Sequence, residues 1–339
     1  MSEPARLLEV EDLTVNFYTR RGVVHAVRGT TFHVERGETV AVVGESGSGK
    51  SVTSLAILGL ITLPGRIDHG DVRWKGSSLL DAAGRKRIKQ IRGKELAVVF
   101  QDPMTSLNPL FTVSAQICEV LKHHLGLGRK EAEERVVELL DLVGIPSPRE
   151  RAKAYPHELS GGQRQRVMIA MALACDPELL IADEPTTALD VTIQAQILEL
   201  IAELQQRLGL AVLLVTHDLG VVAGVCKRVV VMYGGRIMEK GSAEEIFERP
   251  AHPYTAGLLR STPRLDVVER RLVGIDGAPP NMIEPPPGCP FQPRCPFAIE
   301  ECLEPPPFKR SETGREVACW RAFDLEPDWE RERAEQLVH

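Results

Sequence analysis

The chain has 339 residues, of which 43% are hydrophobic and 26% are charged. This composition is ordinary for a folded protein and excludes a fibrous or wholly disordered chain. The net charge is −6 and aromatic residues make up 5%, which argues against a nucleic-acid partner bound by bulk charge or by base stacking. The length predicts one large α/β domain with an appendage, or two domains.

No apolar run approaches the roughly 18 residues that a bilayer-spanning helix needs. The N-terminal sequence Met-Ser-Glu-Pro lacks the basic and apolar regions of a signal peptide. We therefore expect a cytoplasmic protein with reduced thiols, and we expect any membrane association to go through a partner.

Short apolar runs predict buried strands in the first third of the chain, at 7–10, 13–17, 38–43 and 96–100. Between 113 and 143 the apolar residues recur at three- and four-residue spacing, which predicts helices. The segment from about 106 to 164 has no strand signal, so we expect a helical insertion there.

Further along, strands and helices alternate. A helix is predicted over 160–174 and a longer one ends at Gly209, which is typical of a helix C-terminus. The strands predicted around them are 179–182, 211–215 and 229–232. This alternation predicts an α/β fold with a parallel sheet covered by helices on both faces.

A phosphate-binding loop is predicted directly after the strand at 38–43. The segment Gly44-Glu45-Ser46-Gly47-Ser48-Gly49-Lys50-Ser51 fits the pattern G-x-x-x-x-G-K-[ST] and precedes a helix-prone segment. Glycine lets the backbone reach phosphate oxygens, and the N–H groups with the helix start form an anion nest. Lys50 is expected to contact the β- and γ-phosphates, and Ser51 is expected to bind Mg²⁺. The alternative is an ordinary turn, and the loop alone does not separate kinases, GTPases and ATPases.

Polar residues follow three other predicted strands. Asp183 and Glu184 end the strand at 179–182, where Asp183 would orient Mg²⁺ and Glu184 would polarise the attacking water. Gln101 and His217 also follow strands, and the carboxyl ends of parallel strands line the ligand crevice. Gln101 would reach Mg²⁺ and the water, and His217 the γ-phosphate. Taken singly, the histidine and the glutamine could equally be structural.

A second anion-binding segment is predicted at Leu159-Ser160-Gly161-Gly162-Gln163, which directly precedes a helix. One nucleotide does not need two such helix starts from one domain. We therefore expect this segment to contact the γ-phosphate held by another subunit. The alternative is a simple N-capped helix.

The order of these motifs resembles the nucleotide-binding domain of ATP-binding cassette (ABC) transporters, over about residues 6–260. The motifs are the phosphate loop, Gln101, Leu159–Gln163, Leu179–Pro185, Thr187–Asp190 and His217. The resemblance implies a P-loop (RecA-like) ATPase domain over 1–260 that uses Mg²⁺ and hydrolyses ATP. It also implies a sandwich dimer, with each ATP between the phosphate loop of one subunit and the Leu-Ser-Gly-Gly-Gln signature of the other.

The resemblance further implies individual roles. Gln101 corresponds to the Q-loop glutamine, Glu184 to the catalytic base, Asp190 to the D-loop aspartate and His217 to the switch histidine. An aromatic residue near the N-terminus should stack on adenine. Phe17 is the first candidate, with Tyr18 next to it, and the alternative is that Phe17 belongs to the core.

The C-terminal part combines prolines with clustered cysteines. Prolines concentrate between 261 and 307, which excludes long helices and central strands there. Four cysteines follow the pattern C-x5-C-x6-C-x16-C, at Cys289, Cys295, Cys302 and Cys319. Four thiolates suit Zn²⁺ or a cubane iron–sulfur cluster, and such a centre would contribute folding energy. The spacing differs from the C-x2-C pairs of zinc ribbons, and four free structural cysteines are the alternative.

Glu248–Thr255, together with Gly288–Pro290 and Arg294–Pro296, resembles the C-terminal extension of oligopeptide and dipeptide importer ATPases. This resemblance implies an extension over 261–339 and favours a [4Fe–4S] cluster over Zn²⁺, with a structural or regulatory role.

The same resemblance implies the partners: a second ATPase subunit, commonly a different chain, two transmembrane permease subunits and, indirectly, an extracytoplasmic peptide-binding protein. The chain would lie on the cytoplasmic face of the membrane as a peripheral subunit. Its contact with the permeases is expected near 101–120.

Three other functions are weighed against this one. Related cassettes serve nickel, sugars or antibiotics, and the ATPase does not touch the cargo. A soluble ABC protein acting on nucleic acid or ribosomes is disfavoured by the acidic charge. A P-loop kinase or GTPase is excluded by the signature at Leu159–Gln163.

Overall fold

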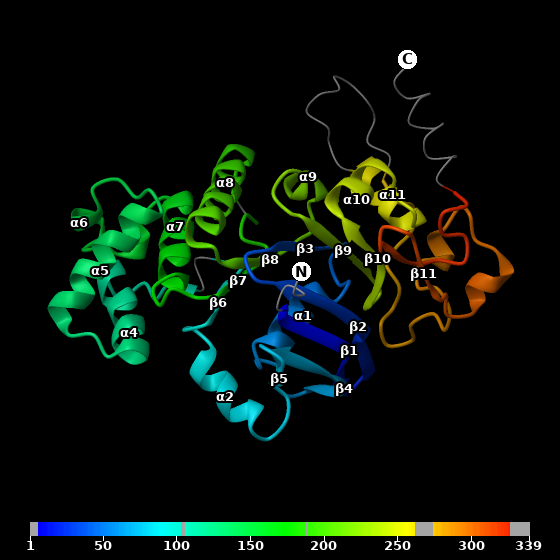
Figure 1. Ribbon diagram of the computed structural model, residues 1–339, viewed down its shortest axis with the longest axis horizontal. Helices are drawn as coiled ribbons and strands as arrows, with labels where there is room; N and C mark the ends of the chain where they lie inside the picture. The colour runs from blue at the N-terminus through cyan, green and yellow to red at the C-terminus, as the bar shows by residue number, and fades with distance from the viewer. Residues whose placement is uncertain (1–5, 103–105, 188, 262–273, 326–339) are drawn as a thin grey trace, which may run out of the picture. The chain divides into compact units, whose positions relative to one another are not determined.

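The computed structural model describes residues 6–102, 106–187, 189–261 and 274–325 (Figure 1). The chain divides into two compact units. The described part of the first unit consists mainly of residues 79–215, with 34–39. The second unit contains residues 7–33, 40–78 and the chain from 216 onward.

The first unit contains a parallel sheet with the strand order β8–β7–β6. Its strands are β6 (Leu96–Val99), β7 (Leu179–Asp183) and β8 (Ala211–Thr216). All three are short runs of aliphatic residues with almost every position buried, which is the pattern of parallel strands covered on both faces. These strands confirm the ones predicted from the sequence.

The helices of the first unit are α2 (Gly84–Ile91), α4 (Val113–Leu125), α5 (Arg129–Leu142), α6 (Pro148–Arg151), η1 (Pro156–Glu158), α7 (Gly161–Ala172) and α8 (Val191–Leu208). Four of them, α4, α5, α7 and α8, lie where the sequence predicted helices, and the others were not predicted. The helices α4, α5 and α7 pack on one another, as Figure 1 shows. Gly209 ends α8 with φ 65°, as predicted. Residues 106–160 form no strand, which agrees with the expected helical insertion.

The second unit contains an antiparallel sheet with the order β2–β1–β4–β5. Its strands are β1 (Arg6–Thr19), β2 (Gly22–Glu35), β4 (Gly65–Trp74) and β5 (Ser77–Ser78). The two short strands predicted at 7–10 and 13–17 are one long strand. The register against β4 shifts between Glu11 and Val15, and Asp12 has a positive φ of 46°. This irregularity interrupts the alternation of apolar residues, so the sequence looked like two strands.

A further sheet of the second unit has the order β11–β12–β10–β9–β3. Only β3 and β9 are parallel, and the other neighbours are antiparallel. The strands are β3 (Thr39–Val43), β9 (Arg228–Tyr233), β10 (Arg236–Ser242), β11 (Phe308–Arg310) and β12 (Glu316–Ala318). The C-terminal segment thus adds two strands to the edge at β10, an addition that the sequence did not predict.

Short helices complete the second unit. They are α1 (Lys50–Ile57), α9 (Leu219–Val222), α10 (Ala243–Glu248), α11 (Pro253–Ser261), η2 (Gln292–Arg294) and η3 (Glu300–Leu303). Across the described ranges, no helix is both long and apolar enough to cross a membrane.

A buried ion pair attaches the C-terminal segment to β10. Glu239 is fully buried, and its Oε1 lies 3.0 Å from Nε of Arg315, which is also buried. The same carboxylate accepts hydrogen bonds from the backbone N–H groups of Ala251 and His252. A buried carboxylate is tolerated only with such partners, so the pair fixes the position of this segment.

The C-terminal segment also shares an apolar core with the rest of its unit. Val317, Cys319 and Ala322 are buried in one cluster with Ala251. The Pro-rich C-terminal part therefore packs on the apolar core of its unit without the help of a metal.

Candidate functional site

The phosphate loop connects β3 to α1 with the backbone that the sequence predicted. Gly44, Gly47 and Gly49 have φ values of 152°, 77° and 103°. A Cβ atom on Gly44 would lie 2.1 Å from the carbonyl oxygen of Met232, and one on Gly49 would lie 2.5 Å from that of Ala26. Glycine is therefore required at both positions by contact with neighbouring backbone as well as by φ.

The side chain of Lys50 lies over this loop. Its Nζ donates hydrogen bonds to the carbonyl oxygens of Gly44, at 2.7 Å, and Glu45, at 3.0 Å. The hydroxyl of Ser48 is buried without a hydrogen-bond partner. Ser51 is exposed on the first turn of α1. A positive charge, backbone N–H groups and a helix start thus meet at one loop, which is the composition of an anion-binding site.

Glu184 follows β7 in a strained conformation. Its φ is +48°, in the left-handed region that only a few per cent of non-glycine residues occupy. Its backbone N–H donates to the carbonyl of Val215 at 2.8 Å. Its Oε2 accepts hydrogen bonds from Nε2 of Gln101 and from Oγ1 of Thr187, both at 3.0 Å.

The structure therefore brings Gln101 and Glu184 together, as the strand positions predicted. The contact of Thr187 was not predicted from the sequence, although this residue lies in the Thr187–Asp190 motif. Asp183 is buried at the end of β7, and His217 is the exposed residue directly after β8.

The signature segment forms the start of α7. Ser160 is the N-cap, and its Oγ accepts from the N–H of Gln163, while the side chain of Gln163 accepts from the N–H of Ser160. Ser160 and Gly161 are exposed. A Cβ on Gly162 would lie 2.9 Å from Ile193, whereas one on Gly161 would make an ordinary 3.4 Å contact with Leu189.

Asp190 caps the next helix, α8. Its carboxylate accepts a hydrogen bond from the N–H of Ile193, and the residue is exposed. Both predicted trans-acting elements, the signature and the D-loop aspartate, are thus exposed helix starts.

The two aromatic candidates for adenine stacking differ in their surroundings. Phe17 is half-buried, and its ring lies against Gly65, where a Cβ atom would approach to 2.7 Å. Tyr18 is 46% exposed, and its hydroxyl donates to Asp68, which raises the pKa of the phenol. The guanidinium of Arg66 lies 5.8 Å from its ring centroid.

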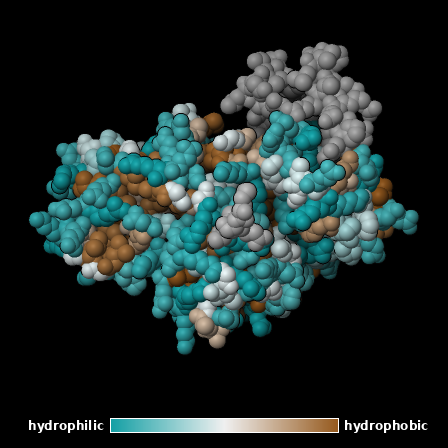
Figure 2. All heavy atoms as spheres, viewed as in Figure 1, coloured by the Kyte–Doolittle hydropathy of each residue, from teal (hydrophilic) through white to brown (hydrophobic). Residues whose placement is uncertain are grey.

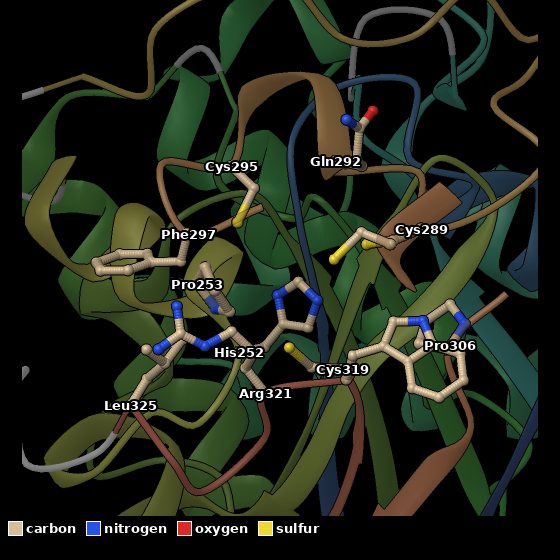
Figure 3. A pocket seen from close by; sticks show the side chains of 12 residues that line it. His252, Pro253, Cys289, Gln292, Cys295, Phe297, Pro306, Cys319, Arg321 and Leu325 are labelled. Atoms are coloured by element: carbon tan, nitrogen blue, oxygen red, sulfur yellow. The ribbon is translucent and has the colours of Figure 1, made fainter. Parts of the chain in front are cut away.

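The four C-terminal cysteines line one pocket. Figure 3 shows the sulfur atoms of Cys289, Cys295 and Cys319 turned toward a common space beside the ring of His252. Cys302 lines it too, and its carbonyl accepts a hydrogen bond from the N–H of Cys289.

Burial shifts the pKa of several side chains that line the pocket. It raises the pKa of the Cys289 thiol to about 12 and that of Cys295 to about 11. It lowers the pKa of His252 to about 3, so this imidazole is neutral. Within the described part of the chain, no group of three or more His, Cys, Asp or Glu side chains is arranged to hold a single metal ion.

The fold and these motifs together define a P-loop ATPase of the ATP-binding cassette class. Residues 27–187 match the family described as ABC transporter, and residues 238–302 match the oligopeptide/dipeptide transporter C-terminal region. A dimeric bacterial ABC transporter cassette, MJ0796, superposes with a TM-score of 0.62 at 28% identity, covering 70% of this chain and 99% of that one.

The closer relatives are peptide-transport subunits. The chain is 52% identical to the oligopeptide transport ATP-binding protein OppD of Salmonella typhimurium, covering 95% of this chain and 96% of that protein. It is 51% identical to the dipeptide transport ATP-binding protein DppD of Bacillus subtilis, covering 93% and 94%. The chain belongs to this family of ABC transporter ATP-binding proteins.

Substitutions of Glu184 and Lys50 should separate catalysis from binding. We expect Glu184→Gln to lower kcat at least about 100-fold while ATP binding is retained, because the amide cannot accept the proton of the attacking water. We expect Lys50→Ala to weaken ATP binding itself, because a charge-assisted contact is lost. Nucleotide titration and phosphate release measure the two effects. Wild-type turnover in Glu184→Gln would exclude Glu184 as the base.

Proposed function

We propose that this chain powers the import of oligopeptides or dipeptides through two transmembrane permease subunits. The observation that carries the proposal is the similarity to peptide-transport subunits, which extends from the ATPase motifs through the C-terminal region at 238–302. A cassette with another cargo (nickel, a sugar or an antibiotic) is the second candidate. The relatives described above are peptide-transport proteins, which favours peptides as the cargo.

In this proposal the phosphate loop and Lys50 hold the triphosphate, and Ser51, Gln101 and Asp183 order Mg²⁺. Glu184 polarises the attacking water. The side chains of Gln101 and Thr187 hold the carboxylate of Glu184 in place through hydrogen bonds. His217 contacts the γ-phosphate, and Phe17 stacks on adenine.

The chain works as one of two ATPase subunits. Ser160, Gly161, Gly162, Gln163 and Asp190 contact the nucleotide of the partner subunit, which is a different chain. The exposure of Ser160, Gly161 and Asp190 supports this role, because groups that serve another subunit must be reachable from outside.

The permeases dock on the first unit, near the segment that follows Gln101. Leu110 is 79% exposed and Phe111 is 53% exposed, which is unusual for large apolar side chains. In Figure 2 further apolar side chains gather over the helices around α4 and α5. Through this contact the chain is held at the cytoplasmic face of the membrane.

Co-purification tests the function. Affinity purification of the chain from membranes should recover two permease subunits and a second ATPase, identified by mass spectrometry. In vesicles, ATP hydrolysis by this complex should rise with an extracytoplasmic binding protein loaded with peptide, and not with one loaded with nickel or a sugar. Stimulation by another cargo alone would replace peptide as the substrate.

The signature segment should act in trans. We expect Gly161→Glu to abolish ATP hydrolysis by the assembled complex, because the carboxylate repels the partner's γ-phosphate. ATP binding by the mutated chain's own phosphate loop should persist. Gly161→Ala is the matched control, since its Cβ meets only an ordinary contact. Loss of ATP binding in a monomeric Gly161→Glu chain would contradict the sandwich arrangement.

We further propose that Cys289, Cys295, Cys302 and Cys319 hold a [4Fe–4S] cluster. The four thiols line one pocket, and Cys₄ is the ligand set of a cubane cluster. A single Zn²⁺ needs all its ligands within about 2.3 Å of one point, whereas each cysteine of a cubane binds a different iron. Zinc is the alternative. When bound, the cluster would cross-link distant points of the extension over 261–339 and stabilise it.

Anaerobic purification tests this site. We expect a brown protein with about four irons per chain, as Cys₄ ligation of a cubane implies. Cys295→Ser should lose the iron and make the extension sensitive to protease, while Cys118→Ser, outside the pocket, should change neither. Stoichiometric zinc without iron would exclude the cluster. Absence of any metal with a protease-resistant extension would exclude a metal site.

A further inference from the structure

The C-terminal extension contacts the phosphate loop through one buried arginine. Arg294 ends the short helix η2, and its side chain is 7% exposed. Its Nη1 lies 2.8 Å from Oε2 of Glu45, the second residue of the phosphate loop. The two residues are 249 positions apart in the chain.

Almost all donors of this guanidinium are used. Nη1 also donates to the hydroxyl of Tyr233, Nε donates to the carbonyl of Asp276, and Nη2 donates to that of Ile275. The group lies 5.7 Å from the ring centroid of Tyr233. Because these partners fix the guanidinium from several directions, it can hold the Glu45 carboxylate in one place.

The backbone of Glu45 is fixed as well. Its N–H donates to the hydroxyl of Tyr254, which is fully buried in α11, and its carbonyl accepts from Lys50. The rings of Tyr233, Tyr254 and Phe291 pack on one another beneath these groups. Tyr254 thus holds the backbone of Glu45, and Arg294 holds its side chain.

Glu45 carries a negative charge into a loop that binds phosphates. An unpaired carboxylate there would repel the nucleotide and could compete for the N–H groups of the loop. The ion pair with Arg294 neutralises this charge and keeps the carboxylate in a fixed place. The extension thus supplies the counter-charge for a carboxylate of the phosphate loop.

Arg294 belongs to the turn between two of the pocket cysteines. The N–H of Gln292 donates to the carbonyl of Cys289, and the N–H of Cys295 donates to that of Gln292. A change in the order of this turn would move Arg294, and with it the partner of Glu45.

We propose that Arg294 is a positioning residue for ATP, which ties the nucleotide affinity of the phosphate loop to the folded state of the turn from Cys289 to Cys295. The proposal rests on ATP binding at this loop. Coupling of this kind is reciprocal, so bound ATP must also stabilise the turn.

The proposal is tested by removing the two charges singly and together in the full-length chain, with ATP binding measured by titration with a fluorescent ATP analogue. Arg294→Ala should weaken binding about tenfold, because the freed carboxylate of Glu45 then repels the phosphates. The double variant Arg294→Ala/Glu45→Gln should recover most of the affinity, because the repelling charge is gone. Arg294→Lys should be intermediate, and the deficit of Arg294→Ala should shrink at high salt.

Two further measurements separate this role from simple unfolding. Arg310→Ala, which breaks an exposed ion pair with Glu316 in the same extension, is the matched control and should bind ATP as the wild type does. ATP should slow proteolysis of residues 274–325 in the wild type and not in Arg294→Ala. Iron and zinc content is measured in every variant.

The outcomes are distinct. Equal affinities of Arg294→Ala and wild type would overturn the proposal, and so would a double variant that binds as weakly as Arg294→Ala. Failure of the wild type to bind ATP would instead overturn the assignment of the phosphate loop itself.

Discussion

The second unit depends on how one buried carboxylate is satisfied. Glu239 lies in the interior of β10, where an unpaired charge would be very unfavourable. Arg315 supplies the counter-charge from the C-terminal segment, and two backbone N–H groups ahead of α11 supply hydrogen bonds. The same carboxylate thus fixes β12, which precedes Cys319, and the turn that carries His252. Two lining residues of the cysteine pocket, Cys319 and His252, thus follow directly on segments that this group holds.

The phosphate loop and the cysteine pocket both pack against the segments around β9 and β10. The turn after β9 contacts the phosphate loop, where the N–H of Gly235 donates to the carbonyl of Ser48. Phe291, between Cys289 and Cys295, packs on Tyr233 at the end of β9. Because aromatic packing is rigid and dense, a displacement on one side of this cluster is transmitted to the other. The C-terminal extension, which looks like an appendage in the sequence, is therefore part of the packing around the phosphate loop.

Sequence patterns predicted those features of this protein that depend on residues close together in the chain. The phosphate loop, the strand before Asp183 and the cap at Ser160 depend on neighbours within a few residues, and the structure has them where the sequence predicted. The approach of Gln101 to Glu184 followed from the rule that parallel strands end at one edge. The ion pair of Arg294 with Glu45 and the addition of β12 to β10 have no such signal. They arise from contacts between distant segments, and a single arginine beside a cysteine does not reveal its acceptor.

The hydroxyl group of Ser160 at the start of α7 can stabilise the helix and remain able to bind a ligand. Ser160 uses a lone pair of its hydroxyl oxygen to accept from the N–H of Gln163, and this leaves the hydroxyl proton to point elsewhere. An aspartate would cap the helix equally well but would present only negative charge to an incoming anion. Serine can therefore cap the helix and donate a hydrogen bond to a phosphate at the same time. Binding of the phosphate then does not require the cap to be broken.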